Sequence, residues 1–556
     1  MTFVDEPSAE AAPLIDSAAT AKPRKPADEA DPPAPSLHSS EGMEKMVRHS
    51  AGLLGSGAAI MLLCSPSAAI ARRSAEPNAA QIIDQSVTVV QRGRDLSAIR
   101  SMDLKVRNAV SHLTDTDHSD SAPWIVDYSD TEWIEDLWGH RRLDRSAIAS
   151  ATGERIESRI LSTPELVQTS ESTDGIAAPT RDDVAPPDWE LANPVRSLLT
   201  AKSAADLRLL GTAKVHLAPT DVLGFTFHGF AVKLYISRDN RLPIAVESLI
   251  TLPGSIAWAS RGDLLERTEW MNWTLVDGIR LATQWDSTRN GKPLVTTTVL
   301  DAKLDVPLNH KLLTPDPEAA AQLSLPGRKN VDDLPLGDPG RPILEIAPGI
   351  VQIPGSWYTT LVRQDDGIVV IDAPISNGYS AKVIAEAKRR FPGLPVKAVI
   401  TTTNYFWHTA GLREYASRKI PIFALDRNAG VVRDLLEAPH RLAPDSLALS
   451  HRKGVINPVS EPTLLGSGDN QLLLIPARRA SGQMLMVYFP RRRILHTAEL
   501  VQPLGPKGSL LFPEYLEEVT DAVRDSGIQP VTMIGMHMSP TPWARVGEAI
   551  AKADAG

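Results

Sequence analysis

The chain has 556 residues, a formal net charge of −9, and 42% apolar and 22% charged residues. This length and composition fit a globular protein of two or three domains. The charge is spread along the chain with no long basic run, so nucleic acid is not an expected partner. Cys64 is the single cysteine, which excludes a disulfide within the chain.

The first 71 residues have the composition of a leader and a targeting segment. Residues 1–42 are rich in Pro, Ala, Asp and Glu, which predicts a disordered leader. Residues 43–71 hold a basic start, an apolar run and a final Ala69-Ile70-Ala71, the pattern of a signal peptide. Alternatively, residues 51–71 stay as a membrane anchor, since about 20 residues cross a bilayer. Either way we expect an exported protein, periplasmic or membrane-anchored and facing the periplasm.

Residues 76–311 predict a mostly antiparallel β domain with a few helices. Apolar spacing predicts helices from Ala79 to Val90 and over residues 193–210, whereas residues 113–195 lack a periodic pattern and are expected to be irregular. From Lys214 the apolar residues alternate with polar ones, as in half-buried strands. Asp277-Gly278 and Asn290-Gly291 predict tight hairpin turns.

The tryptophans are concentrated in the same region. Eight of the eleven lie between Trp124 and Trp285. They form either an aromatic groove for an apolar ligand or ordinary sheet packing, because tryptophan is common on half-buried pleated surfaces.

Prolines separate this region from a second domain. Six of them lie between Pro315 and Pro342, which marks residues 312–341 as a Pro-rich linker before a domain over residues 342–556. In that domain an apolar strand ends at Asp372-Ala-Pro, a helix follows from about Tyr379, and a second apolar strand comes next.

The segment after the second strand carries a family resemblance. Residues 399–411, Val-Ile-Thr-Thr-Thr-Asn-Tyr-Phe-Trp-His-Thr-Ala-Gly, resemble the T-H-x-H-x-D-H-x-G-G motif of the metallo-β-lactamase superfamily. Segments 476–490, 494–500 and 534–543 resemble later parts of its pattern, in the same order. The region before is similar to the curved-sheet lipoprotein-carrier domain that precedes some exported members. The resemblance implies an α+β chain, with a four-layer αβ/βα metallo-β-lactamase sandwich after the antiparallel β domain.

Most positions that hold metal ligands in this superfamily hold other residues here. Thr403 and Tyr405 stand at the first two His positions, and Trp407 stands at the Asp position. A later His position falls on Arg479, or on Ala480 if the gap moves by one. Zinc prefers imidazole, thiolate and carboxylate donors, which these residues do not offer.

Three potential ligands remain: His408, Glu499 and His537. The resemblance places all three at one metal position, the second of two. Two His and one carboxylate form a recognised catalytic zinc set, so the expected cofactor is either none or one zinc ion. The resemblance also implies that Asp372 is a structural residue behind the metal site.

Two functions remain open. The preferred hypothesis is a non-hydrolytic binding or scaffold protein of the cell envelope, a pseudoenzyme whose old cleft is lined by Tyr405, Phe406 and Trp407. Such aromatic surface suits a small-molecule or apolar ligand. The alternative is a mononuclear-zinc hydrolase of an ester, amide or lactam that uses the three remaining ligands. Whether the chain is an enzyme stays open at this point.

Overall fold

The computed structural model describes residues 77–111, 126–149, 155–164, 166–171, 175–176, 189–255, 261–322, 330–477, 484–504, 509–510 and 513–554. The predicted leader, the targeting segment with Cys64, and Arg479 lie outside these residues. No helix of the part described is both long enough and apolar enough to cross a membrane.

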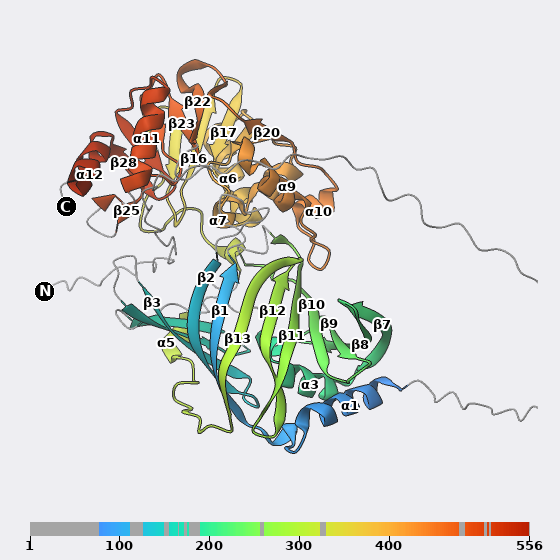
Figure 1. The fold of residues 1–556 in the computed structure, drawn as a ribbon. Helices are drawn as coiled ribbons and strands as arrows, with labels where there is room; N and C mark the ends of the chain where they lie inside the picture. The colour runs from blue at the N-terminus through green and yellow to red at the C-terminus, as the bar shows by residue number, and fades with distance from the viewer. Residues whose placement is uncertain are drawn as a thin grey trace, which may run out of the picture. The chain divides into compact units, whose positions relative to one another are not determined.

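The first part of the chain is one sheet of 13 strands (Figure 1). Consecutive strands pair in antiparallel fashion within two meanders, β1–β6 and β7–β13. The meanders meet where β1 pairs with β13, with Met102 opposite Leu304. The strands are β1 (Ser101–Ser111), β2 (Val126–Asp136), β3 (Arg141–Ala149), β4 (Arg155–Ser162), β5 (Val167–Glu171), β6 (Gly175–Ile176), β7 (Arg208–Val215), β8 (Ala218–Phe227), β9 (Phe230–Ser237), β10 (Pro243–Ile250), β11 (Leu264–Val276), β12 (Ile279–Arg289) and β13 (Lys292–Leu304).

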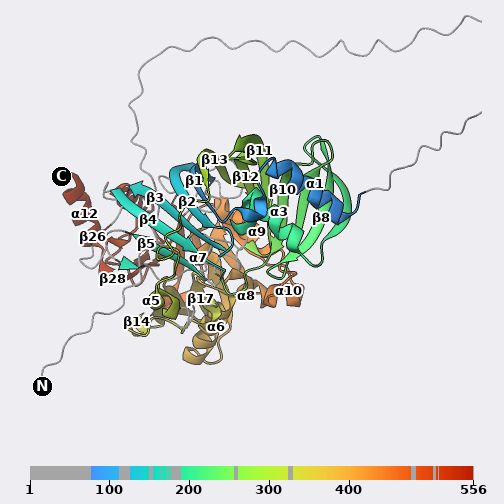
Figure 2. The same ribbon diagram turned by 90° about the horizontal axis from the view of Figure 1, so that it is seen from below.

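Helices α1 (Ala79–Gln91) and α3 (Pro194–Ser203) cover one face of this sheet (Figures 1 and 2). The short α2 (Trp189–Ala192) packs into the same core through Leu191. Asn78 and Gln81 form a reciprocal cap at the start of α1, and Asn193 caps α3 just before a proline at its first position. Both caps satisfy amide groups that the helix itself leaves unpaired. The apolar side chains of α1 and α3 then pack with those of the strands into one core.

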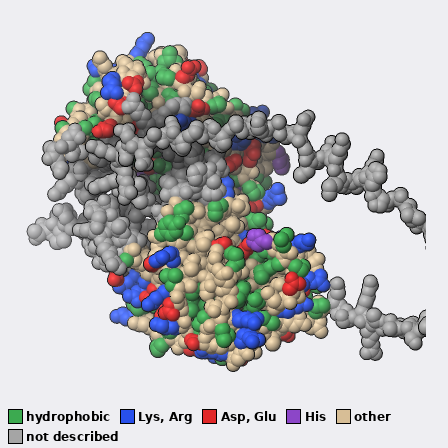
Figure 3. All heavy atoms as spheres, in the orientation of Figure 1, with side chains coloured by type: hydrophobic (Ala, Val, Ile, Leu, Met, Phe, Trp, Pro, Cys, Tyr) green, Lys and Arg blue, Asp and Glu red, His purple; other side chains and the backbone are tan. Residues whose placement is uncertain are grey.

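Two sequence expectations for this part were wrong. Five strands, β2 to β6, lie within the stretch expected to be irregular, and β7 begins inside the expected helix 193–210, which ends at Ser203. The exposed face of β1 to β4 carries ion pairs such as Arg107–Asp130 and Arg145–Glu132. These charges hide the apolar alternation on which strand prediction depends. Basic and acidic side chains are also interspersed on the face that Figure 3 shows.

The segment between the two sheets is short of regular structure. It contains α5 (Pro317–Gln322) and the single-turn η2 (Val331–Asp333). Leu313 is buried with Leu143 and Leu161 of the first sheet, whereas Val331 is buried in a core of the second domain. Each end of the segment is therefore packed onto one of the two domains.

The second domain contains two larger sheets. The first has the order β14 to β20, with β17 to β20 parallel, and the second has the order β21-β22-β23-β24-β27-β28. The strands are β14 (Leu344–Ala347), β15 (Ile350–Ile353), β16 (Thr359–Gln364), β17 (Gly367–Ile371), β18 (Val396–Ile400), β19 (Ile422–Leu425), β20 (Ile456–Val459), β21 (Thr463–Leu465), β22 (Leu472–Ala477), β23 (Met484–Phe489), β24 (Ile494–His496), β27 (Thr532–Gly535) and β28 (Met538–Pro542). A small separate pair is β25 (Pro503–Leu504) and β26 (Ser509–Leu510).

Three apolar cores show that this domain has four layers. One core joins the first sheet to its helices, a second fills the space between the sheets, and a third joins the second sheet to α11 and α12. The helices are α6 (Asn377–Arg390), α7 (Phe406–Thr409), α8 (Leu412–Ser417), α9 (Ala429–Glu437), α10 (Ser446–Ser450), α11 (Pro513–Asp525) and α12 (Ala544–Asp554). The chain therefore has the α+β class expected, with a four-layer αβ/βα sandwich after an antiparallel β domain.

Candidate functional site

Four strands of the sandwich end at the same edge, and the candidate residues follow them. Asp372 comes after β17, and Thr401 begins the segment after β18, because Ile371 and Ile400 are paired in register. Glu499 follows β24 and His537 follows β27, whose residues are likewise paired. Leu485 N donates to Thr402 O at 2.8 Å and so connects the two sheets at this edge.

His408, Glu499 and His537 converge at this edge. Glu499 Oε1 lies 3.1 Å from His408 Nε2 and 3.2 Å from His537 Nε2. The three ligand atoms lie within 4.8 Å of one another. His408 and Glu499 are buried, whereas 25% of the His537 side chain is exposed. The cluster is therefore approached from the His537 side.

The electrostatics of the cluster favour neutral His408 and ionised Glu499. Burial lowers the pKa of His408, so its imidazole is neutral at pH 7. Burial alone would raise the pKa of Glu499, but the contacts with His408 and His537 outweigh it and bring that pKa to about 2. A neutral imidazole and a carboxylate are the forms in which these side chains bind a metal.

Two buried polar atoms of the cluster lack hydrogen-bond partners among the described residues. They are Glu499 Oε2 and His408 Nδ1. A carboxylate oxygen left without a donor costs free energy when it is buried, and a cation would relieve that cost. The second nitrogen of a metal-bound histidine normally donates to a carboxylate or a carbonyl, and none of the described residues gives His408 such a partner.

The distances from Glu499 to the two imidazoles fit one metal ion. Two donors about 2.0–2.2 Å from a tetrahedral ion stand roughly 3.3 Å apart, close to the 3.1 and 3.2 Å between Glu499 and the two imidazoles. His408, His537 and Glu499 would hold the ion, which would supply Lewis acidity there. Among the described residues no second group of three such donors lies equally close.

The replaced ligand positions hold packed side chains. Thr403 is fully buried, and its carbonyl accepts a hydrogen bond from Thr401 Oγ1 at 2.8 Å. Tyr405 packs against the core that joins the second sheet of this domain to α11 and α12. Trp407 packs against the core that joins the first sheet of this domain to its helices. These three positions are brought to the site but offer no zinc donors, and Arg479 lies outside the described residues.

Aromatic rings surround His408. Trp407 lies 6.0 Å from it in an edge-on arrangement, and Tyr405 lies 6.2 Å away between ring centroids. Trp357, which the sequence reasoning missed, also packs edge-on, at 5.8 Å. It stands in a loop between β15 and β16 without any motif, so the sequence carried no signal for it.

Asp372 lies behind the cluster and is bonded to the neighbouring strand end. Its Oδ1 accepts from Thr402 N at 2.8 Å and from Thr402 Oγ1 at 2.9 Å. Burial raises the pKa of Asp372 to about 7, against the effect of the Thr402 bonds. His496 is also buried, with Nε2 3.7 Å from Asp372 Oδ2, and burial lowers its pKa to about 3.

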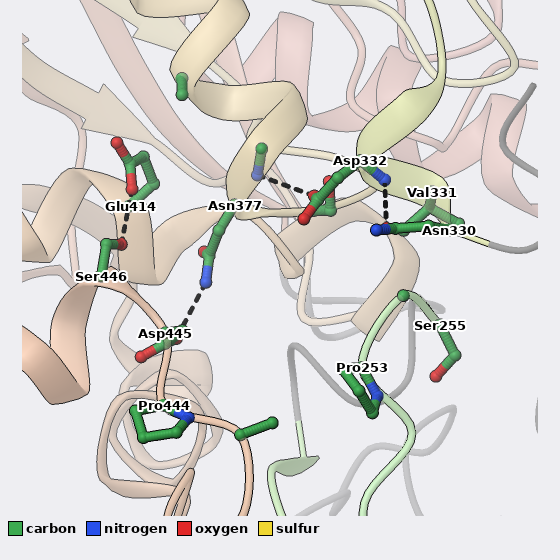
Figure 4. Close-up of a pocket in the computed structure, with 15 residues that line it drawn as sticks. Pro253, Ser255, Asn330, Val331, Asp332, Asn377, Glu414, Pro444, Asp445 and Ser446 are labelled. Atoms are coloured by element: carbon green, nitrogen blue, oxygen red, sulfur yellow. Dashed lines mark hydrogen bonds between the residues drawn. The ribbon is translucent and has the colours of Figure 1, made fainter.

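A cavity of about 420 Å³ lies elsewhere, at the start of α6 (Figure 4). Its lining includes Asp332, Asn377, Glu414 and Asp445 but no residue of the His408 cluster. The carboxylates already accept hydrogen bonds: Asp332 from Gly378 N, Glu414 from Ser446 and Asp445 from Asn377 (Figure 4). They therefore belong to the packing around α6, α8 and α10.

No protein-family model matches the chain, and no curated protein matches it in sequence. Solved structures similar to parts of it include a LolA superfamily protein from Nitrosomonas europaea, with 15% identity and a TM-score of 0.28 over 43% of this chain and 99% of that one. A metallo-β-lactamase from Pontibacter korlensis has 15% identity and a TM-score of 0.30 over 39% and 99%. The inverting sec-alkylsulfatase of a Pseudomonas species has 16% identity and a TM-score of 0.29 over 39% and 40%. No activity follows from similarity at this level.

Proposed function

We propose that the C-terminal domain is a ligand-binding module built on a metallo-hydrolase fold and that it does not hydrolyse. The observation that carries the proposal is the missing partner of His408 Nδ1 among the described residues. Losing such a partner costs a metal site about 10- to 100-fold in affinity or activity. The packed Thr403 and the aromatic Tyr405 and Trp407 leave the other ligand positions without donors as well.

The proposed ligand is a small apolar or ring-bearing molecule. Trp357, Tyr405 and Trp407 present aromatic surface around His408, and aromatic walls with a few polar groups are usual in small-molecule sites. The competing explanation is that these rings only fill the volume of the lost metals and water. A fluorescence screen of wild type against Trp407→Phe separates the two. A ligand in the site should change the wild-type signal, and the change should be smaller in the variant, where Trp357 is the tryptophan that remains beside His408.

We also propose that the protein acts in the cell envelope. The support is the targeting pattern of residues 43–71, as a cleaved signal peptide or an anchor.

A mononuclear-zinc hydrolase is the second candidate. The observations that favour it are the distances from Glu499 to the two imidazoles and Glu499 Oε2, which has no hydrogen-bond partner among the described residues. Its substrate would be an ester, an amide or a lactam.

Metal content and turnover decide between the two functions. For the binding module we expect the purified protein to hold well under one zinc per chain and to show no zinc-dependent turnover of ester or lactam substrates. About one zinc per chain, lost in His537→Ala, together with zinc-dependent turnover, would establish the hydrolase instead. The matched control is His310→Ala, because His310 is an exposed histidine outside the cluster; it should leave the zinc content unchanged.

A further inference from the structure

Helix α7, which carries His408, is too short to hold its own position. It spans Phe406–Thr409, and Tyr405 before it makes no side-chain cap. His408 N and Thr409 N both donate to the one carbonyl of Tyr405, at 3.0 and 3.2 Å. One turn of helix is unstable by itself, because its nucleation costs more than so few hydrogen bonds return. Contacts from other elements must therefore fix α7.

One of those contacts comes from the N-terminal sheet. Arg261 lies between β10 and β11, and its guanidinium carbon is 4.9 Å from the ring centroid of Phe406. This is within the range of a cation–π interaction. The Phe406 ring in turn packs edge-on against Trp407 at 4.5 Å, so the contact reaches the residue next to His408.

The next two residues anchor Arg261 to the second domain. Asp263 N donates to Pro439 O at 2.5 Å, and Asp263 Oδ2 accepts from Arg441 N at 2.8 Å and Leu442 N at 3.2 Å. Gly262 has φ +69°, and a Cβ there would stand 2.1 Å from Pro439 O. Glycine is thus required for so close an approach.

The anchoring loop is itself bonded to the helix that follows α7. Arg413 of α8 donates to Leu436 O at 2.8 Å and to Asp445 Oδ1 at 2.9 Å, at the two sides of the loop. Arg413 is buried, as is Asp445. Arg261 therefore reaches α7 directly, and Asp263 reaches α8 through this loop.

We propose that Arg261, Gly262 and Asp263 form a strut by which the N-terminal sheet positions helix α7 and its His408. Arg261 is a positioning residue of the site, and a change in the sheet at β10 or β11 is transmitted to the cluster. The inference rests on the proposed function only in taking the His408 cluster as the site, and it does not depend on whether that cluster binds a metal.

Hydrogen exchange of the 405–411 backbone amides tests the strut without any metal. In Arg261→Met we expect exchange in this segment to accelerate between about twofold and about fivefold, because this is the change that the loss of one exposed cation–π contact would produce. Arg261→Lys keeps a cation over Phe406 and should restore the slow exchange rate. If the arginine acted only through the packing of its side chain, lysine would not restore that rate. Arg107→Met is the matched control, since Arg107 pairs with Asp130 on an exposed face of the sheet.

If Arg261→Met exchanges at the wild-type rate, or if Arg261→Lys is as fast as Arg261→Met, the strut does not position α7. If Arg261→Met also lowers the overall stability, the Phe406→Leu variant is compared with the double variant Phe406→Leu/Arg261→Met. Because leucine has no aromatic ring to contact Arg261, Arg261→Met should then no longer accelerate exchange in residues 405–411. Zinc titration of the same variants also measures whether Arg261 affects the zinc affinity of the cluster. If the protein binds no zinc, the hydrogen-exchange rates still test the strut.

Discussion

Asp372 is a residue whose ionisation should make the stability of the sandwich domain depend on pH. Burial raises its pKa from 3.8 to about 7. For an acid whose pKa is raised by folding, stability is complete below the unfolded pKa and is lost as the pH rises toward the folded value. The wild type should therefore lose stability between about pH 4 and pH 7 through this group.

Asp372→Asn should remove that loss. Asn tolerates the left-handed backbone of this position, where φ is +67°, and its side-chain oxygen can still accept from Thr402 N. We expect the difference in unfolding free energy between variant and wild type to grow by roughly 1 kcal/mol per pH unit from pH 4 to 7 and then to level off. Urea unfolding at pH 4.5, 6 and 8 measures it, with the exposed Asp239→Asn as a control for the change of charge. Parallel pH profiles for Asp372→Asn and wild type would contradict the assignment.

At the scale of elements, the contact of α6 with the start of α8 depends on Gly411. A Cβ at Gly411 would stand 2.0 Å from Ser380 Oγ and 2.7 Å from Ser376 O. Gly411→Ala should lower the free energy of unfolding by ~1–3 kcal/mol, because the backbone oxygen cannot move aside without displacing α6. Denaturant unfolding gives the value.

Gly547→Ala is the matched control for that substitution. Gly547 lies inside α12, and a Cβ there meets nothing within 4 Å. Alanine should raise stability by roughly 0.5–1 kcal/mol, since glycine is a poor helix residue. If Gly411→Ala and Gly547→Ala changed the free energy of unfolding equally, steric contact with α6 would not be the reason why position 411 holds glycine.

Elements with a strong local signal were predictable from the sequence. Asp277-Gly278 and Asn290-Gly291 both form hairpin turns with positive φ at each residue, as predicted. The apolar runs of β17 and β18 were found because parallel strands are buried on both faces. Helix 193–210 was overextended because the leucines at 207, 209 and 210 suit a strand as well as a helix.

The convergence of His408, Glu499 and His537 followed from motif order. The contacts of Trp357 and Arg261 did not, since they depend on loops that only the three-dimensional fold brings near α7.

At the scale of the whole molecule, the targeting pattern gives a direct prediction. If residues 43–71 are cleaved, the mature chain begins near Arg72. N-terminal sequencing of the periplasmic fraction tests the prediction. A full-length product in the membrane fraction would instead show an anchor.

The pairing of β1 with β13 has a consequence for how the protein reaches its native state. Every other pair of adjacent strands in the 13-stranded sheet is also consecutive along the chain. The pair β1 and β13 is the exception, because Met102 is opposite Leu304, which lies far along the chain. At synthesis rates of about 5–20 residues per second, β1 waits on the order of ten seconds or more for its partner. During that time Met102, Leu104 and Val106, all buried in the finished core, have only β2 beside them. Closure of so long a loop is entropically slow, so the last step of refolding should be the joining of two preformed meanders.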